Sequence, residues 1–424
     1  METGTAELEA KARRARGATR ELAFLSSSTK NRALRTVAAS LRSAAAAILA
    51  ANHLDYEEAK ASGMSEAMLD RLLLTQARIE AMAVDVLTVA SLPDPIGQEF
   101  DSRRLPNGLQ LCKRRVPLGV IAAIYESRPN VTIDISSLCL KSGNACILRG
   151  GKEARRSNLA LARVVQDACR AEGVPDGAVE FIESGDRALV GQLLRMRQYI
   201  DLVIPRGGAE LIRLVSENAT MAVVTGGIGV CHAFIDESAD VDMALRIVHN
   251  AKVQRPTVCN ALDCVLVHRG IAARFLPRLR EMWANAGVQM RCDEASLEVL
   301  DGPAGEGLVA AGDADWGREF LSLVAAIKVV ANLDEAIAHI HRFGSGHSEA
   351  IVTESYGSSN RFQSEVDAAC VYVNASTRFT DGSQFGLGAE IGISTQKFHA
   401  RGPMALEEIT SYKWIALGTG QIRE

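Results

Sequence analysis

The sequence predicts an α/β protein in which helices pack on largely parallel sheets. From Val116 onward, apolar strand-like runs alternate with amphipathic helical segments, an order typical of βαβ units. The first 90 residues instead place apolar side chains three and four positions apart, as in Leu34, Val37 and Leu41, which predicts a helical N-terminal layer. A chain of 424 residues with 47% hydrophobic and 23% charged residues can bury a sizeable core in one to three domains. This composition excludes disordered, collagen-like and coiled-coil proteins.

Residues 103–115 are expected to form a β-hairpin. Asn107 and Gly108 stand between two strand-like runs and can supply the positive φ angles of a tight two-residue turn. The arginines of this segment and Lys113 suit a ribbon that faces solvent or another subunit.

Two series of strands and helices follow the hairpin, which favours two α/β domains. The expected strands are 120–125, 145–148, 179–182, 202–204, 222–224 and 232–235, then 263–268, 323–330, 350–352 and 371–373. The expected helices are 133–141, 157–172, 187–196 and 209–218, then 239–253, 272–286 and 333–343. The glycine-rich segment 381–403 resembles neither element.

Charge and hydropathy limit the partners that we expect. The chain has 47 lysines and arginines against 51 acidic residues, so its net charge of −4 gives no broad attraction for nucleic acid or an anionic membrane. Its longest apolar runs, such as 116–125, are much shorter than the roughly 20 residues of a transmembrane helix. The N-terminus mixes glutamates with arginines, unlike a secretory signal. A cytoplasmic protein without nucleic-acid or membrane partners is therefore expected.

The nine cysteines are scattered and include no Cys-x-x-Cys pair, which argues against a disulfide framework or a zinc knuckle. No metal site is predicted, because His339 and His341 lie two apart on a predicted helix and face different sides. Cys259 lies between a predicted helix and strand, where Arg255 could lower its pKa and favour a nucleophilic thiolate. From this context a functional and a structural Cys259 are equally supported, whereas Cys264 belongs to an apolar strand.

A polar turn follows the strand 120–125, at the carboxyl end where open α/β sheets bind ligands. Arg128 could bind a carboxylate or phosphate, and the Asn130 amide could donate to an oxyanion. The same residues also suit a simple polar turn around Pro129, and residue types alone favour that simpler interpretation.

Three glycine-rich turns also follow predicted strands. They are Arg149-Gly150-Gly151-Lys152, Pro205-Arg206-Gly207-Gly208 and Thr225-Gly226-Gly227-Ile228-Gly229. Glycine allows a ligand close to the backbone, and a following helix N-terminus attracts phosphate. No Gly-x-Gly-x-x-Gly or Walker sequence is present in this context, so each turn alone is a weak signal. Together they favour an anionic or nucleotide ligand.

Several ordered segments carry a resemblance to a known family over nearly the whole chain. They are 116–130 (beginning Val-Pro-Leu-Gly-Val), 141–153 (beginning Lys-Ser-Gly-Asn-Ala), 251–268, 343–354, 379–382 (Phe-Thr-Asp-Gly), 385–395 (Phe-Gly-Leu-Gly-Ala-Glu-Ile-Gly-Ile-Ser-Thr) and 401–404 (Arg-Gly-Pro-Met). In these segments the chain resembles the gamma-glutamyl phosphate reductases, or glutamate-5-semialdehyde dehydrogenases, a branch of the aldehyde dehydrogenase superfamily.

The resemblance implies an aldehyde dehydrogenase-like fold, with two Rossmann-like α/β domains and a small β-ribbon that assists oligomerisation. Residues 1–234 would form the NADPH-binding domain, including the hairpin 103–115. Residues 235–387 would form the catalytic domain, and 388–424 a returning tail and oligomerisation segment.

The resemblance also implies roles for individual residues. Cys259 matches the catalytic cysteine, and Asn130 is similar to the oxyanion asparagine of the superfamily. Glu319 matches a glutamate that contacts the nicotinamide ribose. The positions that match cofactor-binding residues are Arg149, Gly150, Gly151, Lys152, Arg206, Gly207 and Gly208. Two cations near the adenosine ribose, Arg149 and Lys152, would suit the 2′-phosphate of NADPH.

The implied activity is NADPH-dependent reduction of L-glutamyl 5-phosphate to L-glutamate 5-semialdehyde, through a thioester on Cys259, in proline biosynthesis. Arg128 and Arg255 are candidates for binding the phosphate or the α-carboxylate. Val224 occupies the place of the glutamate with which oxidative relatives hydrolyse the thioester. The implied partners are a second copy of the chain and glutamate 5-kinase as a separate chain. The alternatives are an aldehyde dehydrogenase acting on another acyl donor, such as an acyl-CoA, and a non-catalytic relative.

Overall fold

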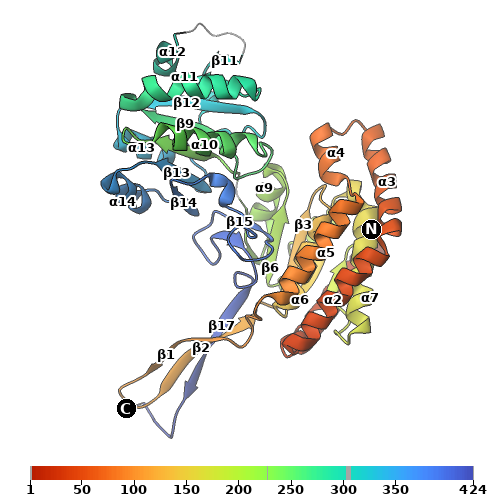
Figure 1. The fold of residues 1–424 in the computed structure, drawn as a ribbon. Coiled ribbons are helices and arrows are strands. Elements are labelled where there is room, and N and C mark those ends of the chain that lie inside the picture. The colour runs from red at the N-terminus through yellow and green to blue at the C-terminus, as the bar shows by residue number, and fades with distance from the viewer. Residues whose placement is uncertain (1, 227, 302–306, 424) are drawn as a thin grey trace. The chain divides into compact units, whose positions relative to one another are not determined.

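The computed structural model describes residues 2–226, 228–301 and 307–423 and divides the chain into two compact units. Unit 1 comprises Met1–Gly226, Gly386–Gly392 and Pro403–Glu424, and unit 2 comprises Gly227–Phe385 and Ile393–Gly402. The chain therefore passes between the units four times (Figure 1). Gly227, in the third glycine-rich turn, lies outside the described residues.

Unit 1 begins with the expected helical layer. Its helices are α1 (Glu2–Leu22), α2 (Ser27–Ser43), α3 (Ala45–Ala61), α4 (Glu66–Leu72) and α5 (Gln76–Ser91). The Ser26 and Thr75 side chains accept hydrogen bonds from backbone N–H groups at the starts of α2 and α5, which fixes where these helices begin. Within the described residues, only α2 and α3 taken together, with a bend of 67° between them, have the length and apolar composition of a membrane span; no single helix does.

The sheet of unit 1 is parallel and has the strand order β5-β4-β3-β6-β7. Its strands are β3 (Val120–Tyr125), β4 (Ala145–Arg149), β5 (Val179–Phe181), β6 (Leu202–Arg206) and β7 (Ala222–Val223). The connecting helices are α6 (Asn130–Lys141), α7 (Arg155–Ala171), α8 (Ala188–Leu193) and α9 (Ala209–Asn218), with the short helix η1 (Lys152–Ala154) before α7. The strand order reverses between β3 and β6, so the turns after these two strands meet at a switch point of the Rossmann type.

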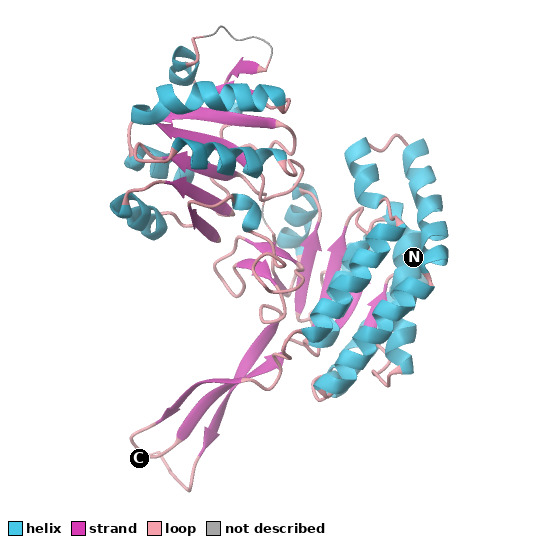
Figure 2. Cartoon of the chain, viewed as in Figure 1, coloured by secondary structure: helices cyan, strands magenta, loops and turns pink. Residues whose placement is uncertain are grey.

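A three-stranded antiparallel ribbon extends from unit 1 (Figure 2). It consists of β1 (Glu99–Arg104), β2 (Gln110–Pro117) and β17 (Thr410–Leu417). The hairpin of β1 and β2 confirms the predicted hairpin, but the predicted two-residue turn is wrong. Leu105 and Leu109 pair across three residues, and Gly108 has a positive φ of 89° whereas Asn107 does not. Pro106 has a fixed φ and no N–H, so it lengthens the loop.

Unit 2 contains a seven-stranded parallel sheet with the order β11-β10-β12-β9-β8-β13-β14. Its strands are β8 (Cys231–Ile235), β9 (Leu262–His268), β10 (Gln289–Cys292), β11 (Leu308–Ala310), β12 (Val324–Val330), β13 (Ser348–Val352) and β14 (Cys370–Val373). Its helices are α10 (Val241–Val253), α11 (Arg269–Asn285), α12 (Glu294–Val299), α13 (Leu333–Phe343) and α14 (Tyr356–Glu365), with short helices η2 (Asp313–Asp315) and η3 (Thr377–Phe379). Buried apolar side chains pack on both sheet faces, including Phe275 and Trp283 on one and Phe234 and Phe362 on the other.

The glycine-rich segment expected to lack regular structure contains two short strands. β15 (Gly392–Ser394) and β16 (Gly402–Met404) pair with each other, and the passages of the chain at 392/393 and 402/403 fall within them. Three residues per strand are too few to show a periodic apolar pattern in the sequence.

Candidate active site

Cys259 lies in the loop between α10 and β9, close to the amino end of the strand. Gly229 lies two residues before β8 and His347 one residue before β13, and β9, β8 and β13 are neighbours in one parallel sheet. Their preceding loops therefore meet at the amino edge of the unit 2 sheet. The Cys259 side chain is half-buried, and the other eight cysteines are buried. Of the nine thiols, Cys259 is thus the one with partial access to solvent.

The backbone of Cys259 is packed directly against Gly229. A Cβ atom on Gly229 would lie 2.5 Å from the carbonyl carbon of Cys259 and 2.7 Å from its Cα, so no side chain fits there. The Gly229 N–H donates to Glu319 Oε1 at 3.1 Å, and the Cys231 thiol donates to the Cys259 carbonyl at 3.3 Å. Glu319 and Cys231 therefore help to fix the backbone on which the Cys259 thiol is mounted.

Asn260 ties the Cys259 loop to η3. Its side-chain amide donates to the carbonyls of Thr380 at 2.9 Å and Arg378 at 3.4 Å, and the Thr377 hydroxyl donates to the Asn260 carbonyl at 2.8 Å. These bonds place Arg378 beside the loop, where its Nε donates to Gln254 Oε1 at 3.1 Å.

Arg378 makes the surroundings of Cys259 electropositive. Burial lowers the pKa of Arg378, the charge of Arg255 lowers it further, and Asp381 and Cys259 act in the opposite direction. The guanidinium groups of Arg255 and Arg378 therefore act electrostatically in the same region as the Cys259 thiol. Positive charge of this kind favours the thiolate form of a cysteine.

A buried ion pair supports the same region from the interior. Lys252 Nζ lies 3.5 Å from Asp263 Oδ1, which also accepts a hydrogen bond from the Phe320 N–H at 3.0 Å. Burial raises the pKa of Asp263 to about 6 and lowers the pKa of Lys252. Because Phe320 follows Glu319 in the chain, this pair holds the segment whose carboxylate receives the Gly229 N–H.

A chain of hydroxyl groups lies beneath the loop. His347 Nδ1 is 2.8 Å from Ser348 Oγ, and Thr380 Oγ1 lies 2.6 Å from both Ser348 Oγ and Tyr372 Oη. Burial lowers the pKa of His347 to about 4, so the ring is neutral near pH 7. This agrees with a structural rather than a catalytic role for His347.

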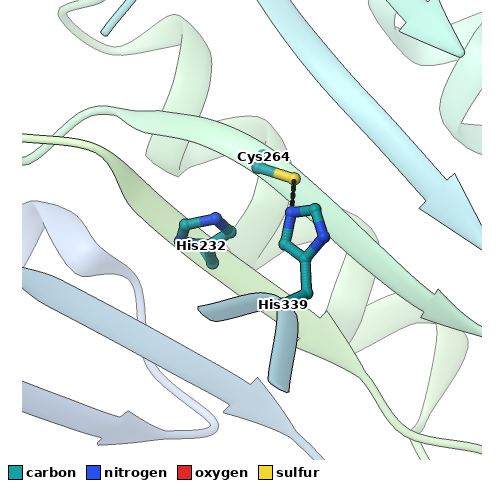
Figure 3. A group of neighbouring side chains, drawn as sticks. All are labelled: His232, Cys264 and His339. Carbon is teal, nitrogen blue, oxygen red and sulfur yellow. Dashed lines mark hydrogen bonds between the residues drawn. The ribbon is translucent and has the colours of Figure 1, made fainter. Parts of the chain in front are cut away.

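His232, Cys264 and His339 form a buried cluster of metal-ligating residue types, with their ligand atoms within 4.8 Å of one another (Figure 3). His232 Nδ1 lies 2.9 Å from Glu349 Oε2, and His339 Nε2 lies 3.8 Å from the Cys264 sulfur. Burial opposes charge on His232, but the negative charge of Glu349 and its hydrogen bond to the ring raise the pKa of His232 to about 10. A protonated ring has no free nitrogen lone pair, so this arrangement favours a buried ion pair over a metal site.

In unit 1, the turns at the switch point contain carboxylates that the sequence did not predict to be important. The Gly208 N–H, at the start of α9, donates to Glu126 Oε2 at 2.9 Å, and a Cβ on Gly207 would lie 2.7 Å from the Glu126 carboxyl carbon. Glu126 therefore takes the position at which a helix N-terminus would attract a phosphate. Because the Glu126 side chain is exposed, a bound anion could displace it by a side-chain rotation.

The turn after β4 holds Arg149 and Lys152 differently. Arg149 is 7% exposed, and its guanidinium donates to the carbonyls of Gly150 at 2.7 Å and Gly185 at 3.2 Å. Lys152, the first residue of η1, is exposed. A Cβ on Gly151 would lie 2.5 Å from the Glu153 carboxyl carbon, so the Glu153 side chain lies directly against the backbone of this turn. Lys152 is thus the more accessible of the two cations.

Asn130 is the first residue of α6, and its side chain is held by Asp134 one turn later. Asn130 Nδ2 donates to Asp134 Oδ2 at 2.9 Å. Asp134 is half-buried, and burial raises its pKa to about 7; the charges of Asp85 and Glu390 also raise it, while the Asn130 hydrogen bond and Arg206 lower it. Asp134 is therefore a positioning residue for the Asn130 amide.

This shift predicts a pH-dependent stability. The folded state holds the Asp134 proton up to about pH 7, whereas an unfolded carboxyl loses it near pH 4, so the free energy of unfolding falls as pH rises between these values. In Asp134→Asn the amide oxygen can still accept the Asn130 hydrogen bond. Because asparagine has no ionisable carboxyl group, the fall in the free energy of unfolding with rising pH is absent. Denaturant titrations should show that, from pH 5 to pH 8, the variant loses on the order of 2 kcal/mol less stability than the wild type. Parallel pH profiles would contradict the assignment.

Comparison with known proteins places the chain in a family. Residues 1–297 match the sequence profile of the aldehyde dehydrogenase family. The chain is 59% identical, over the whole of both sequences, to gamma-glutamyl phosphate reductase of Dehalococcoides mccartyi. It is 55% identical to the Salmonella paratyphi C protein of the same name, with 96% of this chain and 98% of that protein covered. The chain belongs to the gamma-glutamyl phosphate reductase family.

Solved structures agree with this membership. The crystal structure of gamma-glutamyl phosphate reductase from Thermotoga maritima is 48% identical and superimposes with a TM-score of 0.95, covering 99% of this chain and 100% of that one. An acetylating aldehyde dehydrogenase from Geobacillus thermoglucosidasius, at 18% identity and a TM-score of 0.72, shares the fold. The aldehyde dehydrogenase-like fold predicted from the sequence is therefore confirmed. This family member is an oxidoreductase that acts on a small molecule with a nicotinamide cofactor.

Within this reductase-family fold, the predicted site residues fall into two groups. Arg255, Cys259 and Glu319 meet at the amino edge of the unit 2 sheet. The others lie at strand ends, turns or helix starts of unit 1: Arg128, Asn130, Arg149, Gly150, Gly151, Lys152, Arg206, Gly207 and Gly208. Sequence reasoning missed Arg378 and Glu126 as site residues. Their contacts join positions about 80 to 120 residues apart, which no local pattern in the sequence reveals.

Proposed function

We propose that this enzyme reduces L-glutamyl 5-phosphate to L-glutamate 5-semialdehyde, releasing phosphate, as a step of proline biosynthesis. The observation that carries the proposal is a half-buried Cys259 thiol in the field of two guanidinium groups, Arg255 and Arg378. A thiolate nucleophile beside an anion-binding surface suits an acyl phosphate, which has both an electrophilic carbon and a charged leaving group. We take the glutamyl group of the proposed substrate from the relatives, which are named gamma-glutamyl phosphate reductases.

In the first step the Cys259 thiolate attacks the C5 carbonyl carbon of the substrate. The Cys259 backbone N–H and the Asn130 amide are assigned to the oxyanion that forms. The bond between C5 and the phosphate oxygen then breaks, phosphate leaves with the electron pair, and a thioester on Cys259 remains.

The reduction of the thioester needs a hydride, which NADPH supplies when bound. We assign its binding to Arg149, Gly150, Gly151, Lys152, Arg206, Gly207 and Gly208, with Glu319 assigned to the nicotinamide ribose. The residues of the unit 1 turns fit a dinucleotide, since they combine a Rossmann-type switch point with the exposed Lys152 ammonium. Hydride addition to the thioester carbon gives a tetrahedral oxyanion; its carbon–oxygen double bond then re-forms, the carbon–sulfur bond breaks, and Cys259 leaves as the thiolate.

The proposed preference for NADPH over NADH depends on Arg149 and Lys152, the two cations of the turn after β4. Lys152 offers an exposed ammonium group to a 2′-phosphate, whereas Arg149 donates to backbone carbonyls. The ratio of kcat/KM for NADPH to that for NADH should exceed about ten and should fall in Lys152→Ala. Equal use of the two cofactors by the wild type would contradict this part of the proposal.

The reverse reaction tests the proposed activity most directly. Glutamate semialdehyde and NADP⁺ should give NADPH only when inorganic phosphate is present, because phosphate must release the acyl group from Cys259. An enzyme for acyl-CoA substrates would require coenzyme A instead, and a non-catalytic relative would give no turnover. NADPH formation that is independent of phosphate would sink the proposed reaction.

We also propose that the enzyme is a cytoplasmic homo-oligomer that works with a separate glutamate 5-kinase. The ribbon strand β17 exposes Tyr412, Trp414 and Leu417, which supports a homo-oligomer formed through the ribbon. Glutamate 5-kinase, as a separate cytoplasmic chain, would supply the labile acyl phosphate. Light scattering of the purified protein, alone and mixed with the kinase, tests both associations; a monomer in each case would contradict them.

A further inference from the structure

Arg378 has no role in the reaction steps described above, although it is fixed close to Cys259. Its carbonyl accepts a hydrogen bond from the Asn260 side chain, and its Nε donates to Gln254 Oε1 at 3.1 Å. The bonded residues Gln254 and Asn260 lie on either side of Cys259 in the same loop. The half-buried Arg378 side chain is therefore held against the segment that carries the thiol.

The charges around Arg378 are unbalanced. Among the described residues, neither Arg378 nor Arg255 has a carboxylate oxygen within 4 Å of its guanidinium nitrogens. The acidic group that does act on Arg378 is Asp381, whose Oδ1 already accepts the N–H groups of Ser383 at 2.9 Å and Gln384 at 3.2 Å. By contrast, the exposed Arg361 of α14 is paired with both Asp334 and Glu365.

Two neighbouring guanidinium groups without a carboxylate between them repel each other, and a bound anion would relieve that repulsion. A dianion suits the pair better than a monoanion, because each planar fork can bind two oxygens of one phosphate group. Gln254, which accepts the hydrogen bond from Arg378 Nε at 3.1 Å, is the chain neighbour of Arg255, so both guanidinium groups belong to the loop that carries the Cys259 thiol or are bonded to it.

We propose that Arg378 and Arg255 together bind the phosphate group of the substrate, and inorganic phosphate in the reverse direction. This inference rests on the proposed function, which makes phosphate the leaving group at Cys259. The bond from C5 to the phosphate oxygen breaks, and the electron pair moves onto the phosphate. Cations at that oxygen stabilise the charge that develops there.

The reverse reaction separates phosphate from the α-carboxylate, because the two anions are then on different molecules. In Arg378→Gln and in Arg255→Gln, the KM for inorganic phosphate should rise by about 10-fold to 100-fold. The KM for glutamate semialdehyde should stay within about twofold. Arg378→Lys keeps the charge but loses the fork, so its KM for phosphate should lie between those of wild type and Arg378→Gln. Arg361→Gln, on the surface of α14, is the matched control and should leave both constants unchanged.

The outcomes separate this inference from the proposed function. A wild type that makes NADPH without phosphate would contradict the function itself. A phosphate-dependent wild type with an unchanged KM for phosphate in both variants would overturn the inference alone. A rise confined to the KM for glutamate semialdehyde would also overturn it, since the arginines would then bind the α-carboxylate. Because Arg255 is exposed, Arg255→Gln should fold even if Arg378→Gln does not.

Discussion

Replacing Cys259 with serine should reduce kcat by at least about four orders of magnitude, because a hydroxyl near neutral pH provides almost no oxyanion nucleophile. The electropositive surroundings of Arg255 and Arg378 favour a thiolate but cannot ionise an alcohol. The half-buried side chain makes the substitution tolerable for folding. Steady-state kinetics in the reverse direction, together with circular dichroism, should show a folded and inactive protein.

Alkylation provides an independent measurement of the same assignment. Iodoacetamide should modify one thiol per native chain, since eight of the nine cysteines are buried, and peptide mass spectrometry should locate the adduct on Cys259. Cys292→Ala, in the core strand β10, is the control: it should lose some stability through a small cavity but keep its turnover. Normal turnover in Cys259→Ser would show that another group attacks the substrate.

Introducing a methyl group at Gly229 should have the second largest effect. The Cβ of Gly229→Ala would overlap the carbonyl group and Cα of Cys259, so the loop must move. Such a movement changes the position of the thiol and disturbs the hydrogen bond from the Gly229 N–H to Glu319. We expect kcat to fall by about 100-fold or more, as misplacement of a reacting group by 1 Å can do.

Gly191→Ala is the matched control for this substitution. Gly191 lies in α8, and a Cβ there would have no atom within 4 Å. Alanine favours the helix, so this variant should be as active as the wild type and slightly more stable, by about 0.5–1 kcal/mol. Equal kcat values for the two glycine variants would show that the contact between Gly229 and Cys259 has no effect on the reaction.

The sequence was most informative where a strand or helix has a continuous buried face. All six residues of β3 are apolar or aromatic and buried, and α13 has apolar side chains along one side, so both elements were predicted close to their observed bounds. β10 and β11 were not predicted; β10 alternates Gln289 and Arg291 with Met290 and Cys292 and therefore has no continuous apolar run. α14 has Phe362 as its one buried residue, which is too few to give a helical pattern.

Local patterns found Cys259 but could not find its surroundings. Its position between α10 and β9 follows from the apolar pattern of those elements, which are adjacent in the chain. The neighbours Gly229 and Arg378 reach it through contacts that depend on strand order and on long-range hydrogen bonds. The contact of Glu126 with the helix start at Gly208 could not be predicted for the same reason, because Glu126 follows a different strand.

The pairing of β2 with β17 has a consequence for the biosynthesis of the chain. Pro117 pairs with Thr410 and Gln110 with Leu417, so one edge of β2 has no partner until residues 410–417 have left the ribosome. At roughly 5–20 residues per second, translation of the roughly 300 intervening residues takes roughly 15–60 s. During that time β2 presents an open strand edge, the kind of surface on which nascent chains associate. Lys113 and Arg114 pair with Asp101 and Glu99 of β1, so the hairpin of β1 and β2 can form its own ion pairs during that time, and only the pairing with β17 is delayed.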